Sequence, residues 1–88
     1  MRVDWAPGAL RDFSDWEKTD PKIHAAIIDL IADIKRNPFR GLGKPEPLKH
    51  HLSGWWSRRI TGDHRLVYRV SGKRPDQKLE ISQCRYHY

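Results

Sequence analysis

A dense group of ionisable and aromatic side chains occupies residues 43–65, which read GKPEPLKHHLSGWWSRRITGDHR. Lysines, histidines and arginines lie there beside the adjacent tryptophans Trp55 and Trp56. A core segment would seldom carry Arg58 and Arg59, and a solvated loop would seldom carry two tryptophans, because each type is costly in the other environment. Cations beside flat rings suit a partner that is rich in phosphates and bases. The stretch therefore predicts a surface that meets nucleic acid.

The composition of the whole chain narrows the class of protein. The sequence has 88 residues, a formal net charge of +6 and a pI near 9.8, without a long run of like charge. This length predicts one domain, residues 1–88, with a basic surface for nucleic acid or an acidic protein. The single cysteine, Cys84, excludes an internal disulfide and suits a reducing compartment. No apolar run reaches the roughly 20 residues of a membrane span, and no signal peptide is evident, so we expect a cytoplasmic protein without membrane contact.

Two amphipathic helices are predicted in the first half of the chain. Apolar residues recur at helical spacing over residues 9–17, where Trp16 is expected to pack into the core. Asp20 is expected to cap a second helix with its side chain, and Pro21 suits the first helical position. The apolar stripe of this helix, which should cover a sheet, is Ile23, Ala26, Ile27, Leu30, Ile31 and Ile34.

The end of the second helix leads into a stiff loop. Lys35 and Arg36 complement the helix dipole, and they are either a solvated helix end or contacts to nucleic-acid backbone. Residues 37–47 are rich in proline and glycine and should form an irregular loop. Within it Glu46 has a proline on each side, which would hold a carboxylate at a set position, although a solvated loop glutamate is the simpler interpretation.

The second half of the chain predicts a sheet. A short strand at residues 2–5 precedes the helices, and strands are expected at residues 55–61, 64–70 and 79–85. A tight turn should join the first two of these as an antiparallel hairpin, and residues 71–78 form a longer polar loop. The order strand, helix, helix and three strands predicts an α+β fold, with both helices on one face of a small antiparallel sheet.

Alternation along the strands separates a core face from an open face. The strand at 64–70 carries Leu66, Tyr68 and Val70 on one side and Arg65, Val67 and Arg69 on the other. The preceding strand carries Trp55, Ser57 and Arg59 on one side and Trp56, Arg58 and Ile60 on the other. Because Ile60 should lie with the core, Arg59 and Arg65 are expected to pair on the open face.

Other constellations carry less chemistry. Trp55 should either stack on RNA or seal the edge of the sheet. His50, His51 and His64 lack a recognised metal spacing, so no metal site is expected. Cys84 is interpreted as a small buried strand residue and not as a nucleophile.

Three segments together resemble a known family. The segments are VDWAPGALRDFSDWEKTD near the start, GKPEPLKHHLSGWWSRRITGDHRLVY in the middle and CRYHY at the end. They resemble the YoeB (Txe) branch of the RelE-like bacterial toxins, and the likeness covers nearly the whole chain. The chain departs from that pattern mainly at residues 71–78, where its hairpin loop is longer.

The resemblance implies a RelE-like fold and a toxin of a type II toxin–antitoxin pair, which binds the ribosome and cleaves messenger RNA in the decoding site. It also implies a YefM/Phd-type antitoxin, contacts to ribosomal RNA, a toxin homodimer, no cofactor, and contact with DNA only through the antitoxin complex. The family's catalytic roles transfer to Glu46, Lys49, Arg59, Arg65, His87 and Tyr88.

The chemistry of these roles is consistent with the residue types. RNA carries its own nucleophile, the 2′-hydroxyl, so cleavage needs a base, an acid for the leaving 5′-oxygen, and cations for the charge on phosphate. Glu46 is the candidate base and His87 the candidate acid, because imidazole can carry a proton near neutral pH. Arg65, with Arg59 and Lys49, would stabilise the transition state. Further RNA contacts are expected from Tyr88, by stacking or through its hydroxyl, and from Lys44, Trp55, Lys35 and Arg36.

Two other classes of function stay open at this point. The first is a non-catalytic RNA- or ribosome-binding module, in which Glu46 and His87 would be replaceable. The second is a toxin of the same fold that blocks a protein target, as ParE-type relatives block gyrase. Both predict intact messenger RNA after exposure to the protein.

Overall fold

Two helices form one layer of the molecule. The computed structural model describes residues 1–86. Helix α1 (Pro7–Thr19) buries Ala9 and Trp16, which confirms the core position predicted for this tryptophan. Helix α2 (Pro21–Arg36) starts at a proline, whose missing N–H costs nothing in a first turn. Its buried stripe is Ile23, Ile27, Leu30 and Ile34.

Asp20 joins the two helices through its backbone. Its N–H donates to the carbonyl oxygen of Trp16 at 2.9 Å and so ends α1. Its carbonyl oxygen accepts from the N–H groups of Ile23 and His24 and so begins α2. The predicted side-chain cap is wrong, since the Asp20 side chain makes no capping hydrogen bond. With one residue between the helices, the backbone itself satisfies the terminal groups.

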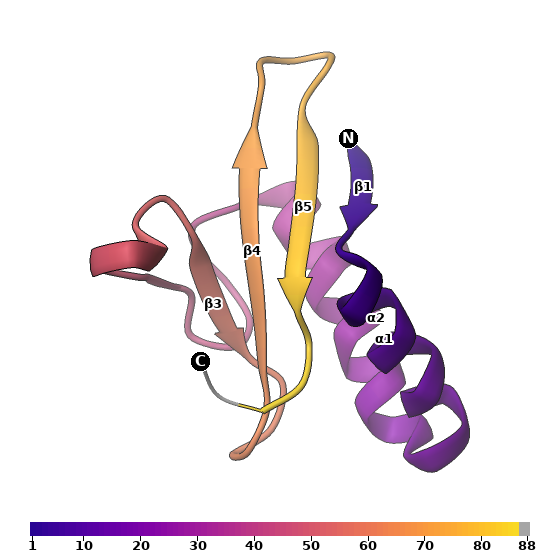
Figure 1. The fold of residues 1–88 in the computed structure, drawn as a ribbon. Helices are drawn as coiled ribbons and strands as arrows, with labels where there is room; N and C mark the ends of the chain where they lie inside the picture. Colours follow the sequence, from indigo (N-terminus) through magenta and orange to yellow (C-terminus); the bar gives the residue numbers. More distant parts are fainter. Residues whose placement is uncertain (87–88) are drawn as a thin grey trace.

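The second layer is a sheet. Within residues 1–86 it has five strands, in the order β1-β5-β4-β3-β2. Its strands are β1 (Arg2–Trp5), β2 (Glu46–Pro47), β3 (Trp56–Arg59), β4 (Arg65–Ser71) and β5 (Lys78–Gln83). Strands β2 to β5 pair antiparallel, and β1 pairs parallel with β5. The α+β fold with both helices on one face is confirmed (Figure 1), and the sheet is mixed because β1 and β5 run in the same direction.

The loop that leads into the sheet is more ordered than its composition indicated. Glu46 and Pro47 pair with β3 as a short edge strand, a position where proline is tolerated because no neighbour needs its N–H. A short 3-10 helix, η1 (His50–Leu52), follows. Glu46 is therefore held in the sheet itself.

The hairpin between β3 and β4 is confirmed, with a longer connection than predicted. The N–H groups of Ile60 and Thr61 both donate to the carbonyl oxygen of His64, at 3.0 Å and 3.3 Å. These bonds close residues 60–64 into a compact turn. The side chain of Arg65, at the start of β4, lies against this turn.

The core lies between the two layers. Leu66 and Tyr68 of β4 and Leu79 and Ile81 of β5 are buried in one cluster with the apolar faces of both helices. We call the other side of the sheet, which the helices do not cover, the open face. Within residues 1–86, no helix has the length and apolar character needed to cross a membrane.

Candidate active site

Two arginines face each other on the open face. Arg59 of β3 lies opposite Arg65 of β4 in the antiparallel register. Alternation places both on the side away from the core, because the residue next to each, Arg58 on β3 and Leu66 on β4, is fully buried. Like charges directly opposite one another destabilise a sheet. An anionic ligand that lies between the two guanidinium groups would remove that cost.

A carboxylate lies one strand away from this pair. Glu46 of β2 is opposite Ser57, two residues before Arg59 on β3, and so shares the open face. Within residues 1–86, neither the Glu46 carboxylate nor the Arg59 guanidinium has a hydrogen bond or ion pair, and both are exposed. Two opposite charges on one surface are thus free to act on a ligand.

Glu46 and Lys49 border the same hollow. This hollow has a volume of about 550 Å³ and is lined by residues 46–52, which include His50 and His51. Lys44, two residues before Glu46, is also exposed. The hollow thus brings the predicted base together with Lys49, one of the predicted cations.

Arg65 is oriented by the turn that precedes it. Its Nη1 donates to the carbonyl oxygens of Thr61 at 2.8 Å, His64 at 3.1 Å and Gly62 at 3.2 Å. A guanidinium carries five N–H donors, so the remaining ones can bind a phosphate. Arg65 therefore combines a fixed orientation with spare donors.

The C-terminal segment returns to the same place. The backbone N–H of Arg65 donates to the carbonyl oxygen of Tyr86 at 3.1 Å. The last described residue is therefore bound to the first residue of β4, beside the arginine pair. His87 and Tyr88 lie outside the described residues, and their roles stay predictions.

Backbone strain lies next to the predicted catalytic residues. Positive φ is uncommon outside glycine and marks positions that the surrounding structure enforces. The non-glycine residues with positive φ among residues 1–86 are Lys44 at 52°, His50 at 58° and Tyr86 at 62°. They lie within two residues of Glu46, Lys49 and His87 respectively. Strained positions of this kind concentrate at functional sites.

Trp55 lies at the far end of the open face. The Arg69 guanidinium is 4.4 Å from the centre of its ring, and Arg69 also binds the Glu80 carboxylate. Hydrogen bonds from Lys78 and Arg69 lower the pKa of Glu80. Arg69 therefore already covers one side of the half-buried Trp55 ring. Stacking of RNA on the remaining ring surface stays a prediction.

The structure does not bring Lys35 and Arg36 to this face. Both belong to the last turn of α2, in the layer on the other side of the sheet. Arg36 forms an ion pair with Asp33 at 3.3 Å. Any contact of these residues with RNA would be separate from the arginine pair.

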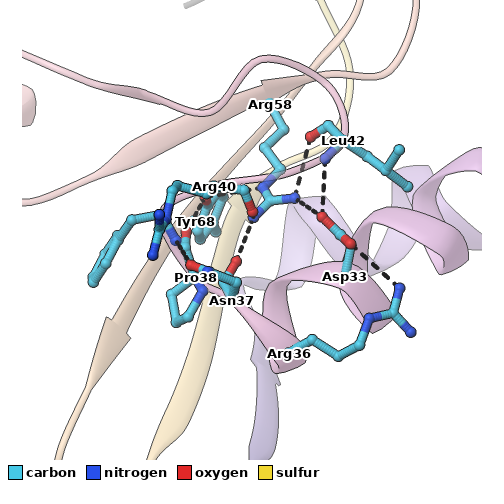
Figure 2. A network of polar contacts seen from close by, with 9 residues as sticks. Asp33, Arg36, Asn37, Pro38, Arg40, Leu42, Arg58 and Tyr68 are labelled. Carbon is cyan, nitrogen blue, oxygen red and sulfur yellow. Dashed lines mark hydrogen bonds and ion pairs between the residues drawn. The ribbon is translucent and has the colours of Figure 1, made fainter.

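Sequence reasoning did not identify the role of Arg58. This residue is fully buried on the core side of β3, and its guanidinium bonds to the Asp33 carboxylate at 2.5 Å. It also donates to the Tyr68 hydroxyl and to the carbonyl oxygens of Asn37, Arg40 and Leu42 (Figure 2). Alternation along the strand had placed Arg58 on the core side. An arginine at a core position needs buried hydrogen-bond partners, and this requirement was the sequence signal of the network.

The network of Arg58 fastens the loop that leads to Glu46. The Leu42 N–H and the Arg58 guanidinium bind the Asp33 carboxylate and lower its pKa. Gly41, with φ of 122°, lies so close to this carboxylate that a Cβ would stand 2.0 Å from an Asp33 oxygen. The loop is thus built around the buried ion pair.

The buried position of Cys84 argues against a role as nucleophile. Burial raises the pKa of the Cys84 thiol to about 12, which suppresses the nucleophilic thiolate. Residues 1–86 contain no cluster of three or more histidine, cysteine or acidic side chains that could hold a metal ion.

Comparisons with known proteins agree with the fold. The model of a family described as "YoeB-like toxin of bacterial type II toxin-antitoxin system" matches residues 5–88. The Toxin YoeB of Escherichia coli K12 is 52% identical, and the match covers 100% of both chains. A solved YoeB/ParE toxin from Agrobacterium tumefaciens superposes with a TM-score of 0.98 at 52% identity, again over 100% of both chains.

A relative from Staphylococcus aureus has been solved in two assemblies. Its YoeB dimer matches with a TM-score of 0.90 and its heterotetrameric YoeB-YefM toxin-antitoxin complex with 0.89, both at 39% identity over 100% of this chain and 98% of that one. Fold and relatives together define a small bacterial toxin of the RelE-like class. Within that class, the chain belongs to the YoeB family of type II toxin–antitoxin systems.

Proposed function

We propose that this protein is a ribosome-dependent endoribonuclease, an mRNA interferase that cleaves messenger RNA in the ribosomal A site and so stops translation. The observation that carries the proposal is the arginine pair, Arg59 opposite Arg65, beside the free carboxylate of Glu46. A face that only gripped phosphates would have no use for an unpaired carboxylate among its cations, because that charge repels the ligand.

In the proposed reaction, Glu46 takes the proton of the 2′-hydroxyl. The resulting oxygen attacks the adjacent phosphorus, and the bond from phosphorus to the 5′-oxygen breaks. His87 donates a proton to that leaving oxygen, which leaves a 2′,3′-cyclic phosphate and a free 5′-hydroxyl. Proton transfers of this kind are typically worth about 10²- to 10⁴-fold each.

The cations act on the phosphate during this step. Arg65 and Arg59 would bind the non-bridging oxygens from adjacent strands, where charge accumulates in the transition state. Lys49 would contribute from the hollow beside Glu46. No metal or cofactor is needed, because RNA supplies the nucleophile and the arginines supply the charge.

Other residues would hold the RNA and the ribosome. Tyr88 would stack on a base or donate through its hydroxyl. Lys44 and Trp55 would contact the RNA on the side of the open face, and Lys35 and Arg36 would meet ribosomal RNA from the helix layer. The site of action would be the cytoplasm, where translation takes place.

A YefM-type antitoxin would neutralise the toxin. The heterotetrameric complex of the S. aureus relative supports this partner, and its dimer supports a toxin homodimer. An acidic, partly disordered segment that folds over the basic open face would mask Arg59 and Arg65. Contact with DNA would arise only within that complex.

The proposal can be tested in a translation extract with end-labelled messenger RNA. Wild type should cut the message, while Glu46→Ala and His87→Ala should still bind ribosomes but cut at least about 10²-fold more slowly. Glu17→Ala, which removes an exposed acid from α1, is the matched control and should cut normally. Translation that stops while the message stays whole would contradict the proposal and favour a non-catalytic binder or a toxin with a protein target.

A further inference from the structure

The backbone makes a sharp, strained bend at Tyr86. Its φ is 62°, a conformation that bulky residues adopt only when their surroundings enforce it. Tyr86 is 60% exposed, so this bend adds little to the core. In the sequence Tyr86 directly precedes His87, the candidate general acid.

His64 holds the amide of this residue. The backbone N–H of Tyr86 donates to His64 Nδ1 at 2.8 Å. The imidazole ring is itself fixed, edge-on to Trp16 with centroids 4.8 Å apart and 5.6 Å from the Tyr86 ring. An acceptor at Nδ1 requires a neutral ring with its proton on Nε2.

Gln83 holds the carbonyl of the same residue. Its Nε2 donates to the carbonyl oxygens of Arg85 at 2.9 Å and Tyr86 at 3.2 Å. The Tyr86 oxygen also accepts from the Arg65 backbone N–H at 3.1 Å. This is the carbonyl through which Tyr86 joins His87, so both polar groups of the Tyr86 backbone are bound.

The segment before the bend is anchored as well. The indole Nε1 of Trp16 donates to the buried carbonyl oxygen of Cys84 at 3.1 Å. The Arg85 guanidinium stacks on Trp16 at 5.2 Å and lies 3.7 Å from the Asp12 carboxylate. The chain thus enters the bend from a fixed point.

We infer that His64, assisted by Gln83, is a positioning residue for His87: it fixes the direction in which the chain leaves Tyr86 and so aims the general acid at the phosphate bound by Arg65. The inference rests on the proposed function. A misplacement of about 1 Å at a catalytic group can cost about 10²-fold in rate. His64 of the turn and Gln83 of β5 hold the bend at Tyr86. They would therefore affect the cleavage rate without contacting the RNA.

Two substitutions test the hydrogen-bond acceptor of His64 and its aromatic ring independently. His64→Phe keeps an aromatic ring against Trp16 and removes the acceptor, while His64→Asn removes the ring and keeps an acceptor oxygen near the place of Nδ1. In single-turnover cleavage on programmed ribosomes at saturating toxin, we expect His64→Phe to be roughly tenfold to a hundredfold slower. His64→Asn should recover most of the rate, and half-saturating concentrations should stay within about twofold of wild type for both.

The control and a double substitution show through which group His64 acts. His24, stacked on Phe13 with centroids 4.3 Å apart, is a histidine in an aromatic contact far along the chain from the bend, and His24→Ala should cut at the wild-type rate. His64→Phe should add no further loss to His87→Ala, because a positioning residue loses its effect once its target is gone. The Tyr86 amide should exchange with solvent faster in His64→Phe than in His64→Asn.

The outcomes distinguish this inference from the proposed function. A wild type that leaves the message intact overturns both. A wild type that cuts, together with a His64→Phe variant that cuts equally fast, overturns the positioning role alone. Losses of His64→Phe and His87→Ala that multiply in the double variant also overturn it, since they would show independent action.

Discussion

Arg58 and Arg59 are neighbours in β3, and their side chains lie on opposite faces of the sheet. Arg58 is fully buried against Asp33 and the loop carbonyls (Figure 2). Arg59 is exposed and lies opposite Arg65 in the register of β3 and β4. The first arginine fastens the loop that leads to Glu46, and the second is the one that we propose binds phosphate. Two adjacent arginines therefore have different roles: Arg58 stabilises the fold, and Arg59 is left for the proposed binding of phosphate.

This division predicts different effects on stability. Arg58→Met should lower the free energy of unfolding by about 3 kcal/mol, because it leaves Asp33 and several carbonyl oxygens without their partner. Arg59→Met should change it by less than about 0.5 kcal/mol, as is usual for exposed positions. Urea unfolding of both variants measures the difference, and equal effects would show that the buried network does not hold the fold.

Acid should weaken the fold partly through Asp33. The Leu42 N–H and the Arg58 guanidinium lower its pKa below the ordinary value of 3.8. A carboxylate with a lowered pKa stabilises the fold above its unfolded pKa, and this contribution disappears as the pH falls through the folded pKa. Asp33→Asn should therefore be less stable than wild type at neutral pH, with a gap that narrows below about pH 4.

Urea unfolding across this pH range tests the point. Asp29→Asn, at an exposed position of the same helix, serves as control and should differ little from wild type at any pH. An Asp33→Asn gap that stays constant from neutral to strongly acid pH would exclude a contribution from Asp33 ionisation.

Cys84 should resist thiol reagents in the folded protein. The side chain is fully buried, its thiol donates to the Ala9 carbonyl oxygen at 3.3 Å, and its pKa is raised to about 12. Labelling with a chromogenic disulfide should proceed only as fast as the protein opens, and it should be complete in denaturant. Rapid labelling of the native protein would show that the segment around Cys84 opens easily.

Lys35 and Arg36 should affect binding and not the chemical step. They lie in the helix layer, across the sheet from Arg59 and Arg65. Replacing both by alanine should raise the toxin concentration needed for half-maximal cutting and reduce the salt dependence of binding by roughly one unit of slope per lost phosphate contact. The maximal rate should be unchanged, and a large fall in that rate would place these residues in the reaction.

Local patterns predicted much of the fold. The apolar spacing within α1 and within α2 predicted the two helices, and the alternation along β4 predicted a strand of the hairpin, because each signal lies within one element. The parallel pairing of β1 with β5 joins Val3 to Leu79, and no local pattern encodes such a contact. The strand at Glu46 was missed because prolines on both sides indicate a loop, although an edge strand accepts them.

The site was foreseen in part. Alternation with a short turn placed Arg59 opposite Arg65, and the register confirms it. The hold of His64 on Tyr86 could not be foreseen, because it depends on a bend 22 residues further along the chain. Likewise, Asp33 binds Arg58 although the two residues are 25 positions apart in the sequence. The only sequence signal of this network was the predicted core-side position of Arg58.

We propose that the open face cuts RNA by using the 2′-hydroxyl of the RNA itself. The most direct measurement compares two ribosome-bound messages that differ in one nucleotide, which carries a ribose or a 2′-deoxyribose immediately before the cleaved bond. We expect wild-type toxin to cut the ribose message to a 2′,3′-cyclic phosphate and to leave the deoxy message whole. Equal cutting of both messages would contradict the account, because water and not the 2′-hydroxyl would then be the nucleophile.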